Sequence, residues 1–231
     1  MPYTNNFQRF NNRWYWVSIR RYPGAEPEGS SNEHTIYVYN TDTYVKEDCI
    51  LKEFKTSLRG KDVFYHGTTA ESAKSIIEQG IDLTESTRHV DFSAGKGFYV
   101  TDDYEKACQW SKRKQRFHCR KPAVVVFKID SNLRQNETHL LLKVDNDTNR
   151  KFWECIVSHF RHGKRSPVIT RILEDVKYIE GPVAHNRRLG QQEIPTPKDS
   201  GKFQQLCVCN QGYARKFGSL ENILCVIFIV D

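Results

Sequence analysis

Two short stretches of sequence, Tyr65-His66-Gly67-Thr68 and Gly95-Lys96-Gly97-Phe98-Tyr99-Val100-Thr101, decide the fold that we expect for this chain. Each contains aromatic and β-branched residues in a short run, which favours a strand. Each is followed by a helix start, because Thr68-x-x-Glu71 and Asp102-x-x-Glu105 have the spacing of a capping signal. We therefore expect two strands, Val63 to His66 and Gly97 to Thr101, that each lead into a helix.

The limits of these helices and the elements that follow are also predicted from pattern. The first helix is expected to end at Gly80, and the second near Lys114 with Ala107 and Trp110 on its inner face. The apolar run Ala123–Ile129 predicts a central strand. A helix is expected at 152–161 with Phe152, Cys155, Ile156 and Phe160 on its buried side, and short strands are expected at 14–19, 35–39, 176–179, 206–209 and 224–230.

The residue types in the two stretches suit the binding of a flat, hydroxyl-bearing ligand. The His66 imidazole can hydrogen-bond a hydroxyl, and Gly67, which lacks a Cβ, lets a ligand approach the backbone. The rings of Tyr99 and Trp110 can lie along a flat group, and each such contact contributes about 0.5 to 1.5 kcal/mol beyond area burial. Phe98, Tyr99 and Trp110 are equally compatible with a simple apolar core.

These stretches, together with Glu105–Trp110, resemble the His-Tyr-Glu branch of the ADP-ribosyltransferase superfamily, which includes the poly(ADP-ribose) polymerases. The resemblance implies an α+β fold in which two small antiparallel-rich sheets surround an NAD cleft. It implies that NAD+ is the substrate. No metal site is expected, because the histidines do not have metal-ligand spacing with a carboxylate or cysteine. The residues that the resemblance assigns to NAD+ binding are His66, Gly67, Thr68, Gly97, Phe98, Tyr99 and Trp110.

Individual roles also follow from the resemblance. It implies that His66 binds ribose hydroxyls, that Gly67 holds the carboxamide, and that Tyr99 and Trp110 sandwich the nicotinamide. Ala107 stands where the family has a serine that bonds the carboxamide, and the loss of one neutral hydrogen bond costs about 1 kcal/mol. The C-terminal half resembles an uncharacterised bacterial family of the same fold through residues 152–156, 181–184 with Arg187, and 203–208.

The third catalytic position departs from the family pattern. Gln205 matches the place where the polymerases carry glutamate, so the catalytic set is His66, Tyr99 and Gln205. A glutamine can bond the ribose 2′-hydroxyl but brings no charge to the reacting centre. Glu193, in a Gln-x-Glu pattern typical of arginine- and guanine-specific relatives, is the rival assignment, although Pro195 argues against a central strand there.

The expected function is therefore mono-ADP-ribosyl transfer from NAD+ to a macromolecular acceptor, either protein or nucleic acid. Chain elongation is not expected without the glutamate. The alternatives are a catalytically silent module that binds NAD+ or ADP-ribose, an NAD glycohydrolase, a nucleic-acid-binding protein that kept only the fold, and an enzyme that removes a 2′-phosphate from RNA.

Composition sets the remaining expectations for this basic chain of 231 residues. Its net charge of +7 suits a polyanionic partner, and arginines alternate with aromatic residues near the N-terminus. That alternation also fits a strand with arginines on its solvent face. Seven cysteines without a CxxC pair suggest free thiols, and no run approaches the roughly 20 apolar residues of a membrane span, so we expect an intracellular protein. We expect a β-rich extension at 1–60 and the catalytic domain at 61–231.

Overall fold

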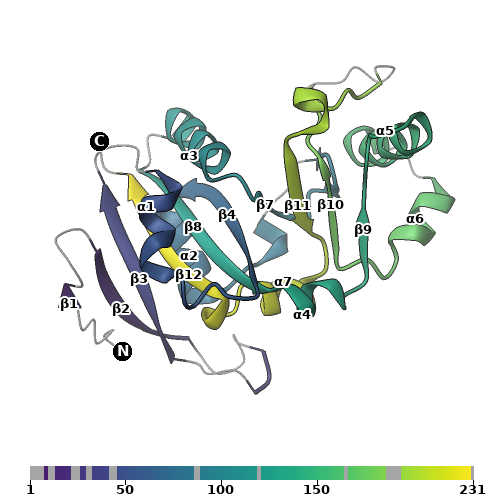
Figure 1. The fold of residues 1–231 in the computed structure, drawn as a ribbon. Helices are drawn as coiled ribbons and strands as arrows, with labels where there is room; N and C mark the ends of the chain where they lie inside the picture. Colours follow the sequence, from purple (N-terminus) through teal and green to yellow (C-terminus); the bar gives the residue numbers. More distant parts are fainter. Residues whose placement is uncertain are drawn as a thin grey trace. The chain divides into compact units, whose positions relative to one another are not determined.

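The computed structural model describes residues 8–9, 14–21, 27–29, 33–41, 46–85, 89–118, 121–163, 166–185 and 194–229. Within these residues the fold is α+β with two mixed sheets (Figure 1). The chain forms two compact units, each built from separate stretches of sequence. The first unit comprises Met1–Asp82, Val100–Arg134 and Arg215–Asp231, and the second comprises Leu83–Tyr99 and Gln135–Ala214.

The sheet of the first unit joins strands from both ends of the chain. The predicted N-terminal strands form an antiparallel pair, and the second of them runs parallel to the C-terminal strand. Strands from residues 1–60 are therefore continuous with the sheet that carries the His-Gly pair. The spatial order is β1 (Gln8–Arg9), β2 (Trp14–Arg20), β3 (Glu33–Thr41), β12 (Ile223–Ile229), β8 (Pro122–Asp130) and β4 (Lys61–Thr69).

Strand β8 is the central strand that its apolar run predicted. It pairs antiparallel with β12 on one side and with β4 on the other. Residues 123–127 are completely buried, because both faces of the sheet are covered at this point. The core of the first unit is built around this strand.

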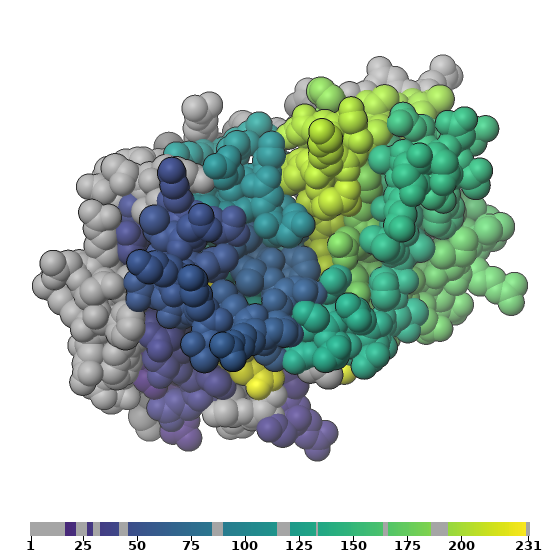
Figure 2. Space-filling model, in the orientation of Figure 1, coloured from purple at the N-terminus to yellow at the C-terminus, as the bar shows by residue number. Residues whose placement is uncertain are grey.

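Helices cover both faces of that sheet. Helix α3 (Tyr104–His118) shares an apolar cluster with α1 (Glu47–Leu51) and η1 (Lys52–Phe54), and the space-filling view shows α1 and η1 at the surface (Figure 2). Helix α2 (Ala70–Gln79) lies on the opposite face, where its Ile77 shares a pocket with Ile36 and Val38. The short segments α4 (Ser131–Gln135), α7 (Gln211–Phe217) and η4 (Leu220–Asn222) complete the described helices that involve this unit.

Both predicted helix starts were wrong by one residue. The Thr69 hydroxyl, rather than that of Thr68, accepts a hydrogen bond of 3.3 Å from the Ser72 amide. Likewise Asp103, rather than Asp102, caps α3 by accepting from the Lys106 amide at 2.9 Å. For α2 the physical reason is that pairing with β8 keeps the chain extended as far as Thr69. Gly80 does end α2, as expected.

The second unit contains the other mixed sheet. Its neighbouring strands are β7 (Phe98–Val100), β11 (Gln204–Val208), β10 (Tyr178–Pro182) and β9 (His139–Leu141). β10 is antiparallel to β11 and parallel to β9, so the sheet is less antiparallel than expected. The other described elements are η2 (Leu83–Glu85), the antiparallel pair β5 (His89–Val90) and β6 (Ser93–Ala94), α5 (Asp147–His162), α6 (Pro167–Leu173) and η3 (Lys198–Gly201).

The predicted buried side of α5 was right for Ile156 and wrong for Phe152 and Cys155. Ile156 is fully buried together with Trp153 and Val157, and Phe160 packs against the same cluster, whereas Phe152 and Cys155 are exposed. The Trp153 indole N–H donates to the Pro182 carbonyl at 2.9 Å, which fixes the rotation of the helix. The apolar residues of this helix form two adjacent stripes, and contact with β10 determines which stripe is buried.

None of the helices in the described part of the chain has the length and apolar composition that crossing a bilayer requires.

Candidate functional site

The two stretches that decided the expected fold hydrogen-bond each other directly. The Tyr65 amide donates to the Thr101 carbonyl at 2.7 Å, and the Thr101 amide donates to the Tyr65 carbonyl at 3.0 Å. Both residues belong to the first unit. The end of the Gly95–Thr101 stretch is therefore held beside the start of the His-Gly stretch.

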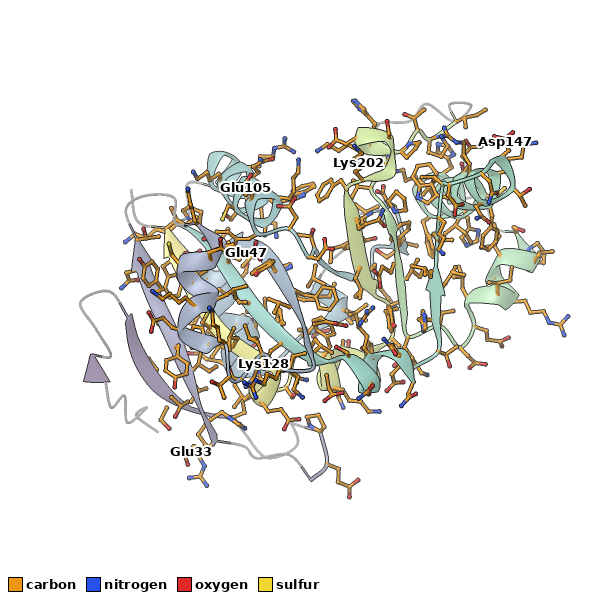
Figure 3. The ribbon with its side chains drawn as sticks, viewed as in Figure 1. Glu33, Glu47, Glu105, Lys128, Asp147 and Lys202 are labelled. Carbon is orange, nitrogen blue, oxygen red and sulfur yellow. The ribbon has the colours of Figure 1, made fainter. Side chains whose placement is uncertain are left out.

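The residues around His66 differ in burial along β4. The Tyr65 side chain is buried, and its hydroxyl donates to Glu47 at the start of α1, which is labelled in Figure 3. Burial and then the Glu47 carboxylate raise the pKa of Tyr65. Thr68 is also buried, and its hydroxyl accepts from the Lys114 ammonium at 3.5 Å. His66, between them, is partly exposed.

Lys114 brings a polar group of α3 to this end of β4. Burial lowers the pKa of its ammonium from 10.5 to about 8. A lysine in this state is a strong candidate for pairing with an anion, because an opposite charge would relieve the cost of desolvation. From the sequence, Lys114 was expected at the end of a helix, in a basic run that adjoins the predicted pocket and could guide a pyrophosphate or nucleic-acid group.

Gly67 lies directly under the backbone of α3. A Cβ at this position would be 2.0 Å from the Ala107 carbonyl oxygen and 3.1 Å from the Ser111 nitrogen. The missing side chain therefore allows the helix to pack on β4. The space that the sequence reasoning reserved for ligand approach on this side of Gly67 is filled by protein.

Trp110 is less buried than predicted. Its side chain is 39% exposed, and the Arg113 guanidinium lies 5.7 Å from its ring centre. The expectation that Trp110 shares the inner face of α3 with Ala107 was wrong, because Cys108 and Ser111 occupy that face with Ala107. Trp110 lies at the edge of the helix, where its ring remains accessible.

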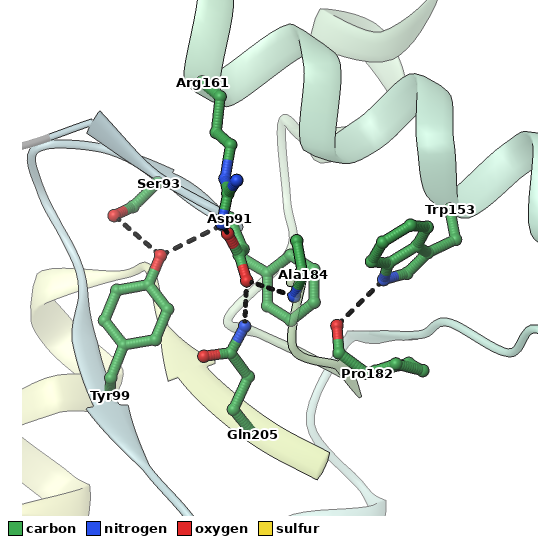
Figure 4. A network of polar contacts seen from close by, with 9 residues as sticks. Asp91, Ser93, Tyr99, Trp153, Arg161, Pro182, Ala184 and Gln205 are labelled. Carbon is green, nitrogen blue, oxygen red and sulfur yellow. Dashed lines mark hydrogen bonds and ion pairs between the residues drawn. The ribbon is translucent and has the colours of Figure 1, made fainter. Parts of the chain in front are cut away.

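In the second unit, the Tyr99 hydroxyl is fixed by protein groups (Figure 4). It accepts from the Phe92 amide at 3.0 Å and hydrogen-bonds the Ser93 hydroxyl, also at 3.0 Å. Burial raises the pKa of this hydroxyl well above its ordinary value. Tyr99 as a whole residue is partly exposed, while its hydroxyl is engaged with Phe92 and Ser93.

Gly97 and Phe98, which precede Tyr99, are buried. A Cβ on Gly97 would lie 2.6 Å from the Cys207 sulfur and 2.6 Å from the Ser93 hydroxyl. Gly97 thus lets the chain before β7 approach β11 closely. As a result, Tyr99 and Gln205 are carried by neighbouring strands of one sheet.

Gln205 belongs to a buried polar network centred on Asp91 (Figure 4). Its Nε2 donates to Asp91 Oδ2 at 2.8 Å, and the Ala184 amide donates to the same oxygen at 2.8 Å. Arg161 Nε donates to Asp91 Oδ1 at 2.6 Å, and Arg161 also forms an ion pair with that oxygen. Asp91 is only 4% exposed, so its charge is compensated inside the protein.

Asp91 and Arg161 were missed by the sequence reasoning. Asp91 does stand between the apolar residues Val90 and Phe92, four residues before the glycine-rich stretch begins, and this position was an available signal. Arg161 is 70 residues away in sequence and gave no comparable signal. Glu193, the rival third residue, and Arg187 lie outside the described residues. Among the residues that are described, no three His, Cys, Asp or Glu side chains are grouped to hold a metal ion.

The chain belongs to the family described as protein of unknown function (DUF3990), which matches residues 63–191. The matched region contains the His-Gly stretch, the glycine-rich stretch and both ends of the Asp91–Arg161 ion pair. It ends before Gln205. No curated protein matches the chain.

Proposed function

We propose that this protein is a mono-ADP-ribosyltransferase, which cleaves NAD+ between nicotinamide and ribose and transfers ADP-ribose to a protein or nucleic-acid acceptor. The observation that carries the proposal is the pair of backbone hydrogen bonds between Tyr65 and Thr101. Two stretches that resemble one family were recognised separately in sequence, and their pairing supports a common role.

The proposed roles follow the groups that are accessible. The imidazole of His66 would hydrogen-bond a ribose hydroxyl from the end of β4. The ring of Tyr99 would lie along the nicotinamide, while its hydroxyl stays bonded to Phe92 and Ser93. Gln205 would accept a hydrogen bond from a hydroxyl of the reacting ribose. Lys114, close to Thr68, would favour the pyrophosphate.

The charges at the third position support a single, slow transfer. Gln205 is neutral, and the nearby Asp91 carboxylate is paired with Arg161. The positive charge that develops on the ribose as nicotinamide leaves would therefore receive little direct electrostatic stabilisation. Catalysis would depend on holding NAD+ and the acceptor in a reactive geometry.

The neutral side chain of Gln205 also favours a second candidate, a silent module that binds NAD+ or ADP-ribose without turnover. A site with a neutral glutamine can retain the ligand contacts and lose the chemistry. The two candidates share the binding residues and differ in whether nicotinamide is released.

The test is incubation of the purified protein with labelled NAD+ and separate pools of protein, DNA and RNA. Transferase activity predicts release of nicotinamide together with label on one pool. Tyr99→Ala should abolish release, whereas Phe152→Ala, which removes a partly exposed aromatic ring from α5, should not. Release without label transfer would indicate a glycohydrolase. Binding of NAD+ in calorimetry without release of nicotinamide would leave the silent module as the function. If the protein neither binds NAD+ nor releases nicotinamide, both candidates are refuted.

A further inference from the structure

Asp91 restricts how its neighbours can be oriented. An ionised carboxylate only accepts hydrogen bonds, so every group that contacts it must present a donor. The donors come from Arg161 at the end of α5, from the Ala184 backbone and from the Gln205 amide. Because Asp91 is 4% exposed, these contacts are not exchanged freely with water.

This restriction determines which end of the Gln205 amide faces Asp91. The NH2 group must point at Asp91 Oδ2, at 2.8 Å, because turning the amide over would place two oxygen atoms in contact. The carbonyl oxygen Oε1 then points away from Asp91, as Figure 4 shows. Gln205 can therefore offer Oε1 as an acceptor to a ligand, while one N–H of its amide is held by Asp91.

The geometry points to Asp91 as a positioning residue that orients Gln205 so that Oε1 accepts a hydrogen bond from a ribose hydroxyl, with Arg161 holding Asp91 in place. The catalytic consequence rests on the proposed function, whereas the orientation itself does not. The family glutamate would bond the same hydroxyl through a carboxylate oxygen. Here an uncharged amide supplies the acceptor, and a second residue fixes its direction.

Replacing Gln205 by the glutamate of the family is therefore not expected to restore the family's catalytic group. Gln205→Glu would bring a second carboxylate to about the position of an amide nitrogen that lies 2.8 Å from Asp91. Two ionised carboxylates at this separation repel each other strongly and neither could donate a hydrogen bond, so one of them must take up a proton at a free-energy cost that grows with pH, or the two groups must move apart. Asp91→Asn would remove that repulsion by supplying an NH2 group for the new carboxylate, and only part of the loss should be recovered because the Ala184 amide then faces a donor in place of its acceptor.

The experiment is a double-mutant cycle of Asp91→Asn and Gln205→Glu, read first by thermal unfolding without NAD+. Gln205→Glu alone is expected to lower Tm by roughly 5 to 10 °C, and the double variant is expected to recover several degrees. Gln135→Glu, at an exposed position of α4, is the matched control and should leave Tm unchanged. An unchanged Tm in Gln205→Glu, or additive effects in the double variant, would overturn the inference.

A spectroscopic measurement on the wild-type protein tests the orientation even if a variant fails to fold. The side-chain NH2 of Gln205, assigned through its loss in Gln205→Met, should exchange slowly with solvent compared with that of Gln135. Exchange as fast as that of Gln135 would contradict the hydrogen bond to Asp91.

Nicotinamide release then tests the catalytic consequence. Asp91→Asn should lower kcat roughly tenfold and change KM for NAD+ by less than about twofold, since orientation of Gln205 matters most as the bond breaks. Gln205→Glu should not exceed the wild-type rate, and a higher rate would refute the positioning role. If the wild-type protein releases no nicotinamide, the proposed function fails, while the unfolding cycle and the exchange rate still decide the orientation.

Discussion

Replacement of Gly67 by alanine should destabilise the protein in the absence of any ligand. The new Cβ would lie 2.0 Å from the Ala107 carbonyl oxygen and 2.9 Å from its carbonyl carbon. Both are backbone atoms of α3, which cannot rotate away as the end of a side chain can. Overpacking of a core costs about 1 to 3 kcal/mol, and this contact with a helix backbone places Gly67→Ala near the upper value.

For a protein of this length, about 3 kcal/mol corresponds to a fall in Tm of roughly 6 to 12 °C. Thermal unfolding followed by circular dichroism, without NAD+, measures it. Gly212→Ala in α7 is the control, because its new Cβ would meet only the Asn210 side chain, at 3.2 Å. A Gly67→Ala variant that melts within about 1 °C of the wild type but no longer binds NAD+ would show that Gly67 faces the ligand and would refute the packing argument.

Three further predictions concern residues of the candidate site. Tyr99→Phe leaves the buried Phe92 amide without its hydroxyl acceptor, so stability should fall by about 1 to 3 kcal/mol, yet the ring remains and nicotinamide release should persist; a folded variant without release would contradict the role given to the ring. Because the pKa of Lys114 is lowered to about 8 from 10.5, the buried charge destabilises the fold below pH 8, and this penalty disappears as the pH rises toward 10.5. Lys114→Met should therefore be about 1 to 2 kcal/mol more stable than the wild type at pH 7, and denaturant unfolding should show the difference narrowing above pH 8; a difference independent of pH would rule out this explanation. Gly97→Ala should lower stability by about 1 to 3 kcal/mol, and unfolding in a Cys207→Ala background should recover part of that loss, since the Cys207 sulfur lies 2.6 Å from the new Cβ; no recovery would show that the clash lies elsewhere.

The sequence predicted the fold best where a pattern is local and strong. The largely buried strand β8 followed from its apolar run, and strands β2 and β3 followed from two β-rich runs. Helix starts were displaced by one residue, because a threonine or aspartate neighbours each expected cap; for α2, strand pairing as far as Thr69 determines which one caps. Strand β9 and helix α6 were missed, since both are short and lack a marked periodicity.

The candidate site was likewise predicted only in part. His66, Tyr99 and Gln205 were selected from residue type and spacing, and β4 and β7 contain the first two as predicted. The neighbours that determine what these side chains can do were not predicted. The sequence could not show that the Tyr99 hydroxyl is bonded to Phe92 or that the space beside Gly67 is filled by α3.

The amino-acid sequence by itself therefore determined the strands and helices that have a strong local pattern and the residues with suitable chemistry, because these depend on periodicity and composition within a few residues. The tertiary structure decided which hydrogen-bonding partner each residue meets. Gln205 and Asp91 are 114 residues apart in the chain, and their contact exists because β11 is placed beside β7 and the loop before it. Such a contact follows from the topology of the fold. The topology depends on how the whole chain buries its apolar residues, and a local sequence pattern does not predict it.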